Sequence, residues 1–234
     1  MNYSDSHLDK GEIYDERFNH KPVFDQSRFE RNIILEVLRM CKPKKILDFA
    51  CGTGRILEIV ENVVEEEVSI IGMDISPSML AVAKRRLKRT TIVEGNFRFH
   101  PMSFEEVNLV TAFRFFSNAE PSLREEAIRF MKHRMRQEGW LLFNMHNNCK
   151  SISNRLLSLK YGKSFGVEEG EFIDFVKNEG FELVQMWSIG LWPQDHRKYY
   201  LSSYLGTLLE KINYLLLSEK HHLGSNNLYL FRKS

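Results

Sequence analysis

The chain has 234 residues, 43% of them hydrophobic, and a formal net charge of +2 at pH 7. This size and apolar content suffice for one sizeable core, so we expect residues 1–234 to form a single domain. The nearly balanced charge argues against general electrostatic attraction to nucleic acid or to a membrane. No apolar run approaches the length of a membrane span and the N-terminus has no signal-peptide core, so we expect a cytoplasmic protein.

The three cysteines, Cys41, Cys51 and Cys149, are few and far apart. Their spacing matches no metal-binding motif, so we expect Cys41 and Cys149 to be reduced thiols, Cys51 to be a turn residue, and no metal to be bound. Two basic clusters, 84–89 and 132–136, fall in stretches with helical spacing. Solvated helix faces explain them better than a nucleic-acid-binding surface.

The first 40 residues predict an arm followed by a helix. Residues 1–25 are polar and aromatic with weak periodicity, and from Gln26 to Met40 apolar residues recur at helical spacing. After Pro43, short apolar strands alternate with helical stretches. The predicted strands are 45–49, 68–73, 90–94, 107–113 and 140–146, and the helices are 54–66, 76–88 and 122–136. This alternation is typical of parallel βαβ units in a doubly wound α/β sheet.

The last third of the chain predicts a helix at 168–178, a strand at 181–189 and a final strand at 227–231. Two segments are additional to this plan. Residues 147–167 carry a short helical pattern, and residues 191–225 carry a helix near 204–217. Long connections in a compact domain are usually functional covers or partner surfaces, so we expect both segments near a substrate site.

The most informative segment is Lys45-Ile-Leu-Asp-Phe-Ala-Cys-Gly-Thr-Gly-Arg55. It predicts a strand, a turn of small residues and a helix N-terminus, which allow close approach of a ligand to the backbone. Twenty residues after Gly54, Asp74 ends the next strand, where a carboxylate can accept both hydroxyls of a ribose. The segment therefore indicates a nucleoside-binding site.

The glycine spacing excludes a dinucleotide. In a G-x-G-x-x-G pattern the third glycine lets the helix pack closely on the strand. In one reading frame the three positions hold Ala50, Gly52 and Arg55, and in the other Gly52, Gly54 and Leu57. Neither frame fits.

The pattern D-x-A-C-G-T-G-R resembles the first motif of class I S-adenosylmethionine-dependent methyltransferases, with Ala50 in place of the first family glycine. Asp74-Ile-Ser-Pro-Ser-Met-Leu80 is similar to the acidic second motif, and 109–113 and 138–143 are similar to the fourth and fifth strands. The resemblance implies a seven-stranded, mostly parallel sheet whose antiparallel last strand is inserted beside the fifth. It also implies S-adenosyl-L-methionine as cofactor.

The resemblance assigns a role to most residues of these motifs. Asp48 faces the methionine amino group, directly or through water, and Asp74 binds the ribose. Asn96 replaces the usual acid near the adenine amino group and can accept through its amide oxygen. The other cofactor-binding residues that we predict line the methionyl and adenine moieties, and they are Ala50, Cys51, Gly52, Thr53, Gly54, Ile75, Met79, Phe97 and Phe113.

The N-terminal arm is predicted to close over the cofactor, with Tyr14 as the contact, because an otherwise polar segment has little reason to carry aromatic rings unless they cover something. The alternative is that its rings, which include Phe18 and Phe24, pack on the outer edge of the sheet.

The acceptor is less well defined. The D/N-P-P-Y/F turn of nucleic-acid amino-methylating enzymes is absent, because Phe115-Phe-Ser-Asn118 follows the fourth strand. The segments 113–121 and 144–148 are similar to a bacterial subgroup associated with polysaccharide or sugar biosynthesis. The resemblance therefore implies a small-molecule acceptor, with a sugar or glycan intermediate as one candidate.

We expect the acceptor over the ends of the fourth and fifth strands, facing Arg114, Asn118, Asn144 and His146. Asn144, His146 and Asn148 alternate, which points them to one face if the strand continues that far. His146 is the candidate base, since its ordinary pKa lies near working pH. The alternative is a structural histidine that is hydrogen-bonded to loop backbone.

Two other functions stay open. An RNA methyltransferase would show a basic groove and often an added module, and a non-catalytic S-adenosylmethionine-binding partner subunit would keep the same motifs. The sequence leaves methylation at O or N, and the oligomeric state, undetermined.

Overall fold

The protein is described by a computed structural model that covers residues 11–15, 23–99, 104, 106–162, 164, 166–191 and 203–234. Seven strands form one sheet in the order β3-β2-β1-β4-β5-β7-β6. Their bounds are β1 Lys45–Phe49, β2 Ser69–Asp74, β3 Thr91–Glu94, β4 Val107–Ala112, β5 Met135–His146, β6 Phe181–Ile189 and β7 Asn226–Lys233. Six strands run in one direction, and β7, which lies between β5 and β6, runs in the opposite direction. This confirms the predicted mostly parallel sheet with an antiparallel last strand beside the fifth.

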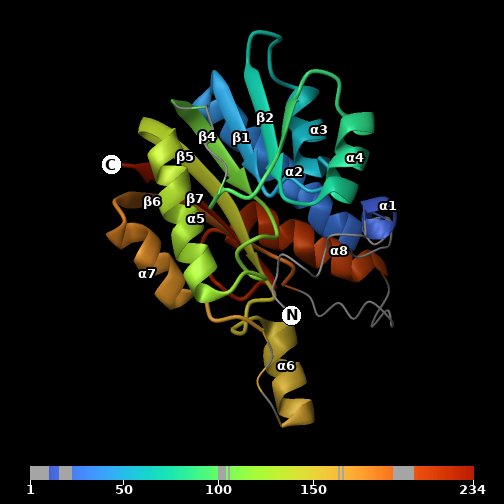
Figure 1. Ribbon diagram of the computed structural model, residues 1–234. Helices are drawn as coiled ribbons and strands as arrows, with labels where there is room; N and C mark the ends of the chain where they lie inside the picture. The colour runs from blue at the N-terminus through green and yellow to red at the C-terminus, as the bar shows by residue number, and fades with distance from the viewer. Residues whose placement is uncertain are drawn as a thin grey trace.

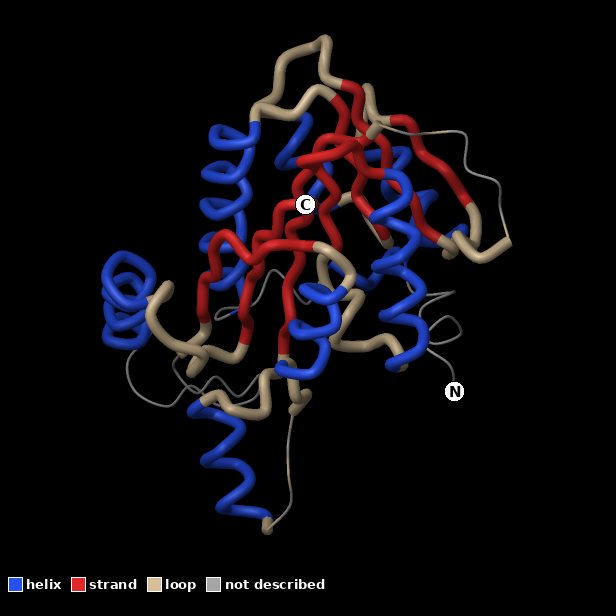
Figure 2. Tube along the Cα trace, turned by 90° about the vertical axis from the view of Figure 1, so that its left-hand side faces the viewer, coloured by secondary structure: helices blue, strands red, loops and turns tan. Residues whose placement is uncertain are grey.

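Helices cover both faces of the sheet (Figures 1 and 2). Their bounds are α1 Gly11–Tyr14, α2 Val23–Cys41, α3 Arg55–Glu61, α4 Pro77–Arg86, α5 Pro121–Arg134, α6 Ile152–Tyr161, α7 Gly170–Asn178 and α8 Ser203–Ile212, continued by the π-helical turn η3 Asn213–Leu217. Helices α5 and α7 pack on one face, and α2, α3 and α4 pack on the other. Among the described helices, none is long and apolar enough to cross a bilayer.

Strand alternation divides the core between the two faces. In β1, Leu47 and Phe49 point to the α5 and α7 side, whereas Ile46 points to α2 and α3. The first side is rich in aromatic residues, and the rings of Phe143 and Phe116 lie 4.9 Å apart, edge to face. The buried apolar layers on both sides hold the sheet rigidly, and its carboxyl edge with it.

Two element boundaries differ from the prediction by more than three residues. Helix α3 ends at Glu61 rather than near residue 66, and the Glu61 carboxylate accepts backbone N–H groups of Lys88, Arg89 and Thr90. Strand β5 begins at Met135, before the expected break at Glu138-Gly139. Glu138 has φ 60° and the β4–β5 register shifts between Val107 and Leu109, so the expected stop is a bulge within the ladder.

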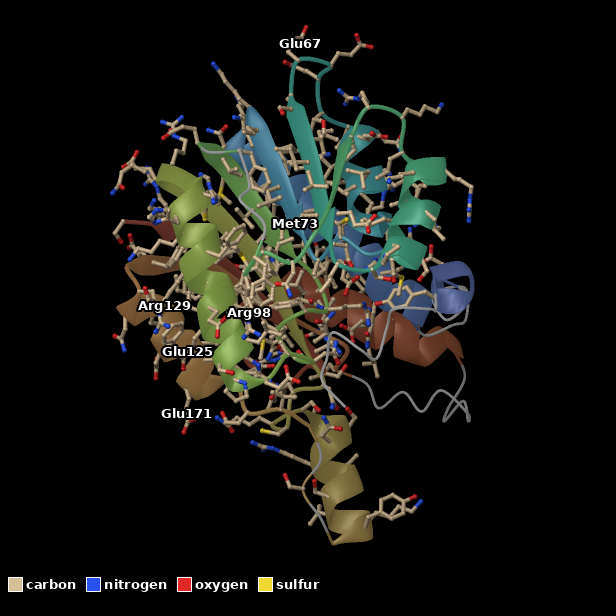
Figure 3. The ribbon with its side chains drawn as sticks, in the orientation of Figure 1. Glu67, Met73, Arg98, Glu125, Arg129 and Glu171 are labelled. Atoms are coloured by element: carbon tan, nitrogen blue, oxygen red, sulfur yellow. The ribbon has the colours of Figure 1, made fainter. Side chains whose placement is uncertain are left out.

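The parallel strands place all of their carboxyl ends at one edge of the sheet. Figure 3 shows this polarity: Glu67, which precedes β2, lies at the far end of the molecule, and Met73 lies toward its middle. Helix α6 follows β5 at the carboxyl edge and projects from the rest of the molecule (Figure 1).

Candidate functional site

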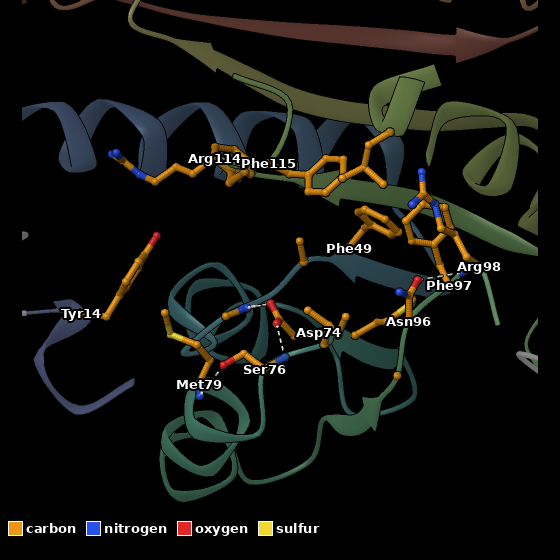
Figure 4. A pocket seen from close by; sticks show the side chains of 17 residues that line it. Tyr14, Phe49, Asp74, Ser76, Met79, Asn96, Phe97, Arg98, Arg114 and Phe115 are labelled. Carbon is orange, nitrogen blue, oxygen red and sulfur yellow. Dashed lines mark hydrogen bonds between the residues drawn. The ribbon is translucent and has the colours of Figure 1, made fainter. Parts of the chain in front are cut away.

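A cleft opens at the carboxyl edge, over the ends of β1, β2, β3 and β4 (Figure 4). Parallel α/β sheets bind ligands in this position. Tyr14 of α1 reaches the same cleft from outside the sheet. The complete lining is Tyr14, Phe49, Ala50, Gly52, Met73, Asp74, Ile75, Ser76, Met79, Gly95, Asn96, Phe97, Arg98, Phe113, Arg114, Phe115 and Leu123.

The turn after β1 forms one wall of the cleft. Ala50, Gly52 and Gly54 have φ of 56°, 54° and 77°, which is the left-handed region. Glycine adopts it without strain and alanine at a cost, so the conformation explains the small residues. A Cβ on Gly52 would meet no atom within 4 Å. A larger residue there would extend into open space beside the cleft, so Gly52 leaves the backbone accessible to a ligand.

Asp74 joins two walls of the cleft. Its Oδ2 accepts the Gly52 N–H at 2.8 Å, and its Oδ1 accepts the Ser76 N–H at 2.8 Å. Burial raises the pKa of Asp74, while the backbone hydrogen bonds act against this. Ser76 caps α4 by accepting the Met79 N–H at 3.4 Å, as the sequence predicts. A carboxylate has about four acceptor positions, so Asp74 can still accept from a ligand.

Asp48 lies beneath the turn and is 1% exposed. The Thr111 hydroxyl donates to its Oδ1 at 2.6 Å, and Oδ2 has no hydrogen-bond partner among the described residues. Burial raises the pKa of Asp48 to about 7, against the effects of Thr111 and Arg55. Asp48 is therefore a buried acceptor behind the cleft and not one of its lining residues.

The other wall contains Ile75, Met79 and Asn96, which the resemblance assigns to adenine, and the predicted cofactor residue Phe97. Ile75 is exposed and Met79 is buried. The Asn96 Oδ1 accepts the Arg98 N–H at 3.0 Å, and the Phe97 ring packs against Phe49 at 5.2 Å. The amide of Asn96 is held in a fixed orientation at the carboxyl edge.

The cleft is bordered by a cluster of charged residues that the sequence did not predict. Glu30 of α2 is fully buried, and its carboxylate lies 3.0 Å from Arg55 Nη2 and 3.6 Å from Arg114 Nη2. Burial raises the pKa of Glu30, but the two arginines and a hydrogen bond from Asn226 outweigh it and lower the pKa. The sequence does contain a sign of this cluster. Glu30 lies three residues before Ile33, on the apolar face of the predicted helix, where a charged residue needs a buried partner.

Comparisons with known proteins agree with this geometry. Residues 46–139 match a methyltransferase domain model. A relative named demethylmenaquinone methyltransferase, from Thermotoga maritima, is 28% identical over 179 residues, which are 65% of this chain and 76% of that protein. The chain is an S-adenosylmethionine-dependent methyltransferase.

Solved structures show the same fold as this methyltransferase. A SAM-dependent methyltransferase from Archaeoglobus fulgidus aligns with TM-score 0.60 at 16% identity, over 94% of this chain and 98% of that one. Magnesium protoporphyrin IX methyltransferase from Synechocystis, solved with bound SAH, aligns with TM-score 0.60 at 12% identity, over 99% and 97%. At these identities the likeness concerns the fold alone.

Three predicted cofactor residues of the methyltransferase belong to the turn after β1 but do not line the cleft. Cys51 is buried and its thiol pKa is raised by burial, and Gly54 lies where a Cβ would approach Leu87 Cδ1 to 2.8 Å. The Thr53 hydroxyl donates to Asp15 Oδ1 at 2.8 Å. None of the three lines the cleft by its side chain.

The structure corrects the predicted grouping at the end of β5. Asn144 is fully buried, where its Oδ1 accepts the Arg114 N–H at 2.6 Å and its Nδ2 donates to Asn226 at 2.8 Å. The chain turns at Asn147, which has φ 64°, so Asn148 does not continue the alternation. Asn148 instead donates to the carbonyl groups of His222 and Gly224.

The two remaining predicted acceptor residues also lie outside the cleft lining. Asn118 is exposed, and its Nδ2 donates to the Arg114 carbonyl at 2.6 Å. His146 is half-buried, and its backbone N–H donates to Ser117 Oγ at 2.8 Å. Of the four residues predicted to face the acceptor, only Arg114 lines the cleft. Among the described residues, no group of three or more His, Cys, Asp or Glu side chains could hold a metal ion.

Proposed function

We propose that the chain methylates an oxygen or nitrogen atom of a small molecule, with the cofactor held in the cleft by Asp74 and the turn after β1. The observation that carries this proposal is the juxtaposition of Asp74 with the accessible backbone of Gly52, 2.8 Å from its carboxylate. The carboxylate suits the ribose hydroxyls, and the small-residue turn suits the methionyl moiety. S-adenosylmethionine supplies the electrophilic methyl group when bound.

The remaining cofactor contacts follow from the cleft lining. Ile75, Met79 and Phe97 offer apolar surface for the adenine ring, and Asn96 offers a fixed amide at its edge. Tyr14 approaches from α1 and can cover the nucleoside. Because the protein holds these groups rigidly, its main contribution is alignment of two reactants, an effect that can supply several kcal/mol.

The acceptor side of the cleft is aromatic. Phe49 and Phe115 line it together with Leu123, beside the predicted cofactor residue Phe113, and Arg114 adds one positive charge. This lining favours an acceptor with an apolar ring and a polar or anionic group near Arg114. The sugar-derived acceptor stays a prediction from the sequence. The name of the Thermotoga relative gives demethylmenaquinone as the acceptor of that protein, and a ring compound of this kind also suits the lining.

The decisive binding experiment is calorimetric titration of Asp74→Ala with S-adenosylmethionine. We expect affinity to fall by about 1.5–3 kcal/mol, the size of a charge-assisted hydrogen bond. Glu94→Ala is the matched control, because Glu94 ends the neighbouring strand at the same level and does not line the cleft. Unchanged affinity in a folded Asp74→Ala variant would refute the assignment.

A second experiment addresses the acceptor. The wild-type chain is incubated with S-adenosylmethionine and panels of hydroxylated or aminated aromatic compounds, sugar nucleotides and bulk tRNA, and S-adenosylhomocysteine formation is measured. Turnover with the aromatic or sugar panel supports the proposal. Turnover with tRNA alone supports the RNA alternative, and cofactor binding without turnover on any panel supports a non-catalytic partner subunit.

A further inference from the structure

The helix formed by α8 and η3 has its apolar face toward solvent. Leu208, Ile212, Leu215 and Leu216 are 53%, 41%, 74% and 63% exposed. Their spacing of four, three and one residues places them along one side of the helix. A surface helix of a globular protein normally buries this side against the core. Here it is left open.

The opposite face of the same helix is polar and buried. Glu210 and Asn213 are 2% and 1% exposed. Glu210 accepts the backbone N–H groups of Gly190 and Leu191 at 2.8 and 2.9 Å, and Asn213 donates to the Ser188 carbonyl at 2.9 Å. Rolling the helix to bury its leucines would leave these buried polar groups without hydrogen-bond partners, which is costly. The outward direction of the apolar face is therefore fixed.

Helix α6 presents a second exposed apolar surface. Leu156, Leu159 and Tyr161 are 52%, 83% and 56% exposed. Helix α6 follows β5, and α8 is bonded to Gly190, directly after β6. Both helices thus lie toward the carboxyl edge of the sheet, at which the cleft opens, and Figure 1 shows α8 across the middle of the molecule and α6 projecting below it.

The charges of these helices have one sign at the surface. The exposed charged side chains of α6, α8 and η3 are Arg155, Lys160 and Lys211. Their one acidic residue, Glu210, is buried. Glu219, two residues beyond η3, is exposed, and its carboxylate accepts from Gln185 at 2.9 Å. Exposed leucines beside basic residues are the composition of helices that lie in the interface of an anionic bilayer.

We propose that α6 and the α8–η3 helix dock on the surface of a bilayer that contains anionic lipids. Anionic headgroups complement the three basic side chains, because each positive charge is attracted to such a surface. A second copy of the chain would bring the same positive charges together. Docking would turn the carboxyl edge, and the cleft with it, toward the lipid.

Flotation with vesicles tests this proposal on the full chain. Phosphatidylcholine vesicles containing phosphatidylglycerol should carry the protein with them, and phosphatidylcholine alone should carry less. Replacing Leu215 and Leu216 together by Gln should lower the partition coefficient by about tenfold or more. Lys211→Glu should lower it on the anionic vesicles only, and added salt should weaken the wild-type binding in the same way.

The matched control is Val184→Gln on β6, because Val184 is 44% exposed but lies outside the two helices. This variant should float like the wild type, and circular dichroism should show that all variants are folded. Absence of wild-type flotation on anionic vesicles would overturn the proposal, as would equal flotation of the Leu215/Leu216 variant. Light scattering tests the alternative that the apolar face binds a second copy of the chain. That alternative would hold if the wild type does not bind vesicles, is a dimer, and dissociates when the two Gln substitutions are made.

Discussion

At the residue scale, Asp74 is oriented before any ligand is present. Backbone N–H groups of Gly52 and Ser76 hold its two oxygens, so the carboxylate has one fixed direction at the end of β2. Binding a ligand then costs little side-chain entropy. Arg114 also loses little side-chain entropy on binding, because its guanidinium is already held near the buried Glu30 while it lines the cleft.

The sequence predicts His146 as a general base, and this role stays a prediction. His146→Ala should lower turnover at least about tenfold while cofactor affinity is unchanged, because a positioned base contributes a hundredfold or more. Steady-state kinetics and titration calorimetry measure the two quantities. Ser117→Ala is the control, since Ser117 accepts the His146 backbone N–H and its loss leaves the imidazole in place. Full activity of the His146 variant would remove it from the mechanism, and loss of folding would favour the structural role.

At the element scale, α1 is attached to the site by specific contacts. Asp15 pairs with Arg86 of α4 and accepts from Thr53 in the turn. A Cβ on Gly11 would come within 2.2 Å of the Ser78 carbonyl oxygen, so glycine permits close packing of α1 on α4. These contacts place Tyr14 at the cleft. Phe18, and the side chain of Phe24, lie outside the described residues.

Deleting residues 1–22 should raise the cofactor dissociation constant roughly three- to tenfold, the 0.5–1.5 kcal/mol of one aromatic contact. The domain should stay folded, because α2 begins at Val23 and keeps its buried face. Titration calorimetry measures the affinity, and circular dichroism checks folding. Asp15→Ala keeps Tyr14 and removes its anchor, so an intermediate effect is expected. Unchanged binding after the deletion would end the idea that the arm covers the cofactor.

At the scale of the whole molecule, buried carboxyl groups make the free energy of unfolding depend on pH. Glu169 accepts from Asn227 and Tyr229 through Oε2, and burial raises its pKa to about 7 from an ordinary 4.5. Between these values the folded protein binds more protons than the unfolded chain, so stability falls as pH rises and is lowest above the folded pKa. Burial of Asp48 acts in the same direction.

Glu169→Gln keeps the shape of the side chain and removes its charge. The variant should be more stable than the wild type at about pH 8, by roughly 1–3 kcal/mol, and close to it at about pH 5. Urea denaturation at the two values measures this difference, and Asp48 leaves part of the pH dependence in place. Equal stability of both proteins at the higher pH would contradict the raised pKa of Glu169.

The net charge of +2 conceals an uneven distribution. The net charge alone predicts no general attraction to a membrane, because it does not say where each charge lies. Helix α6 and the α8–η3 helix collect exposed basic and apolar side chains, while acids such as Glu30 and Glu210 are buried. Only the tertiary structure separates the two groups.

The sequence by itself determined the sheet, the cofactor class and the turn around residues 50–54, because these depend on local patterns. Strand and helix periods, the left-handed conformations of the turn and the cap at Ser76 involve residues close together in the chain. The tertiary structure decided which polar side chains face the cleft. Asn144 is buried against Asn226, 82 residues away, and the polar face of α8 is buried against the end of β6. Alternation and helical spacing predict that one face differs from the other, but partners distant in the sequence decide which face is buried.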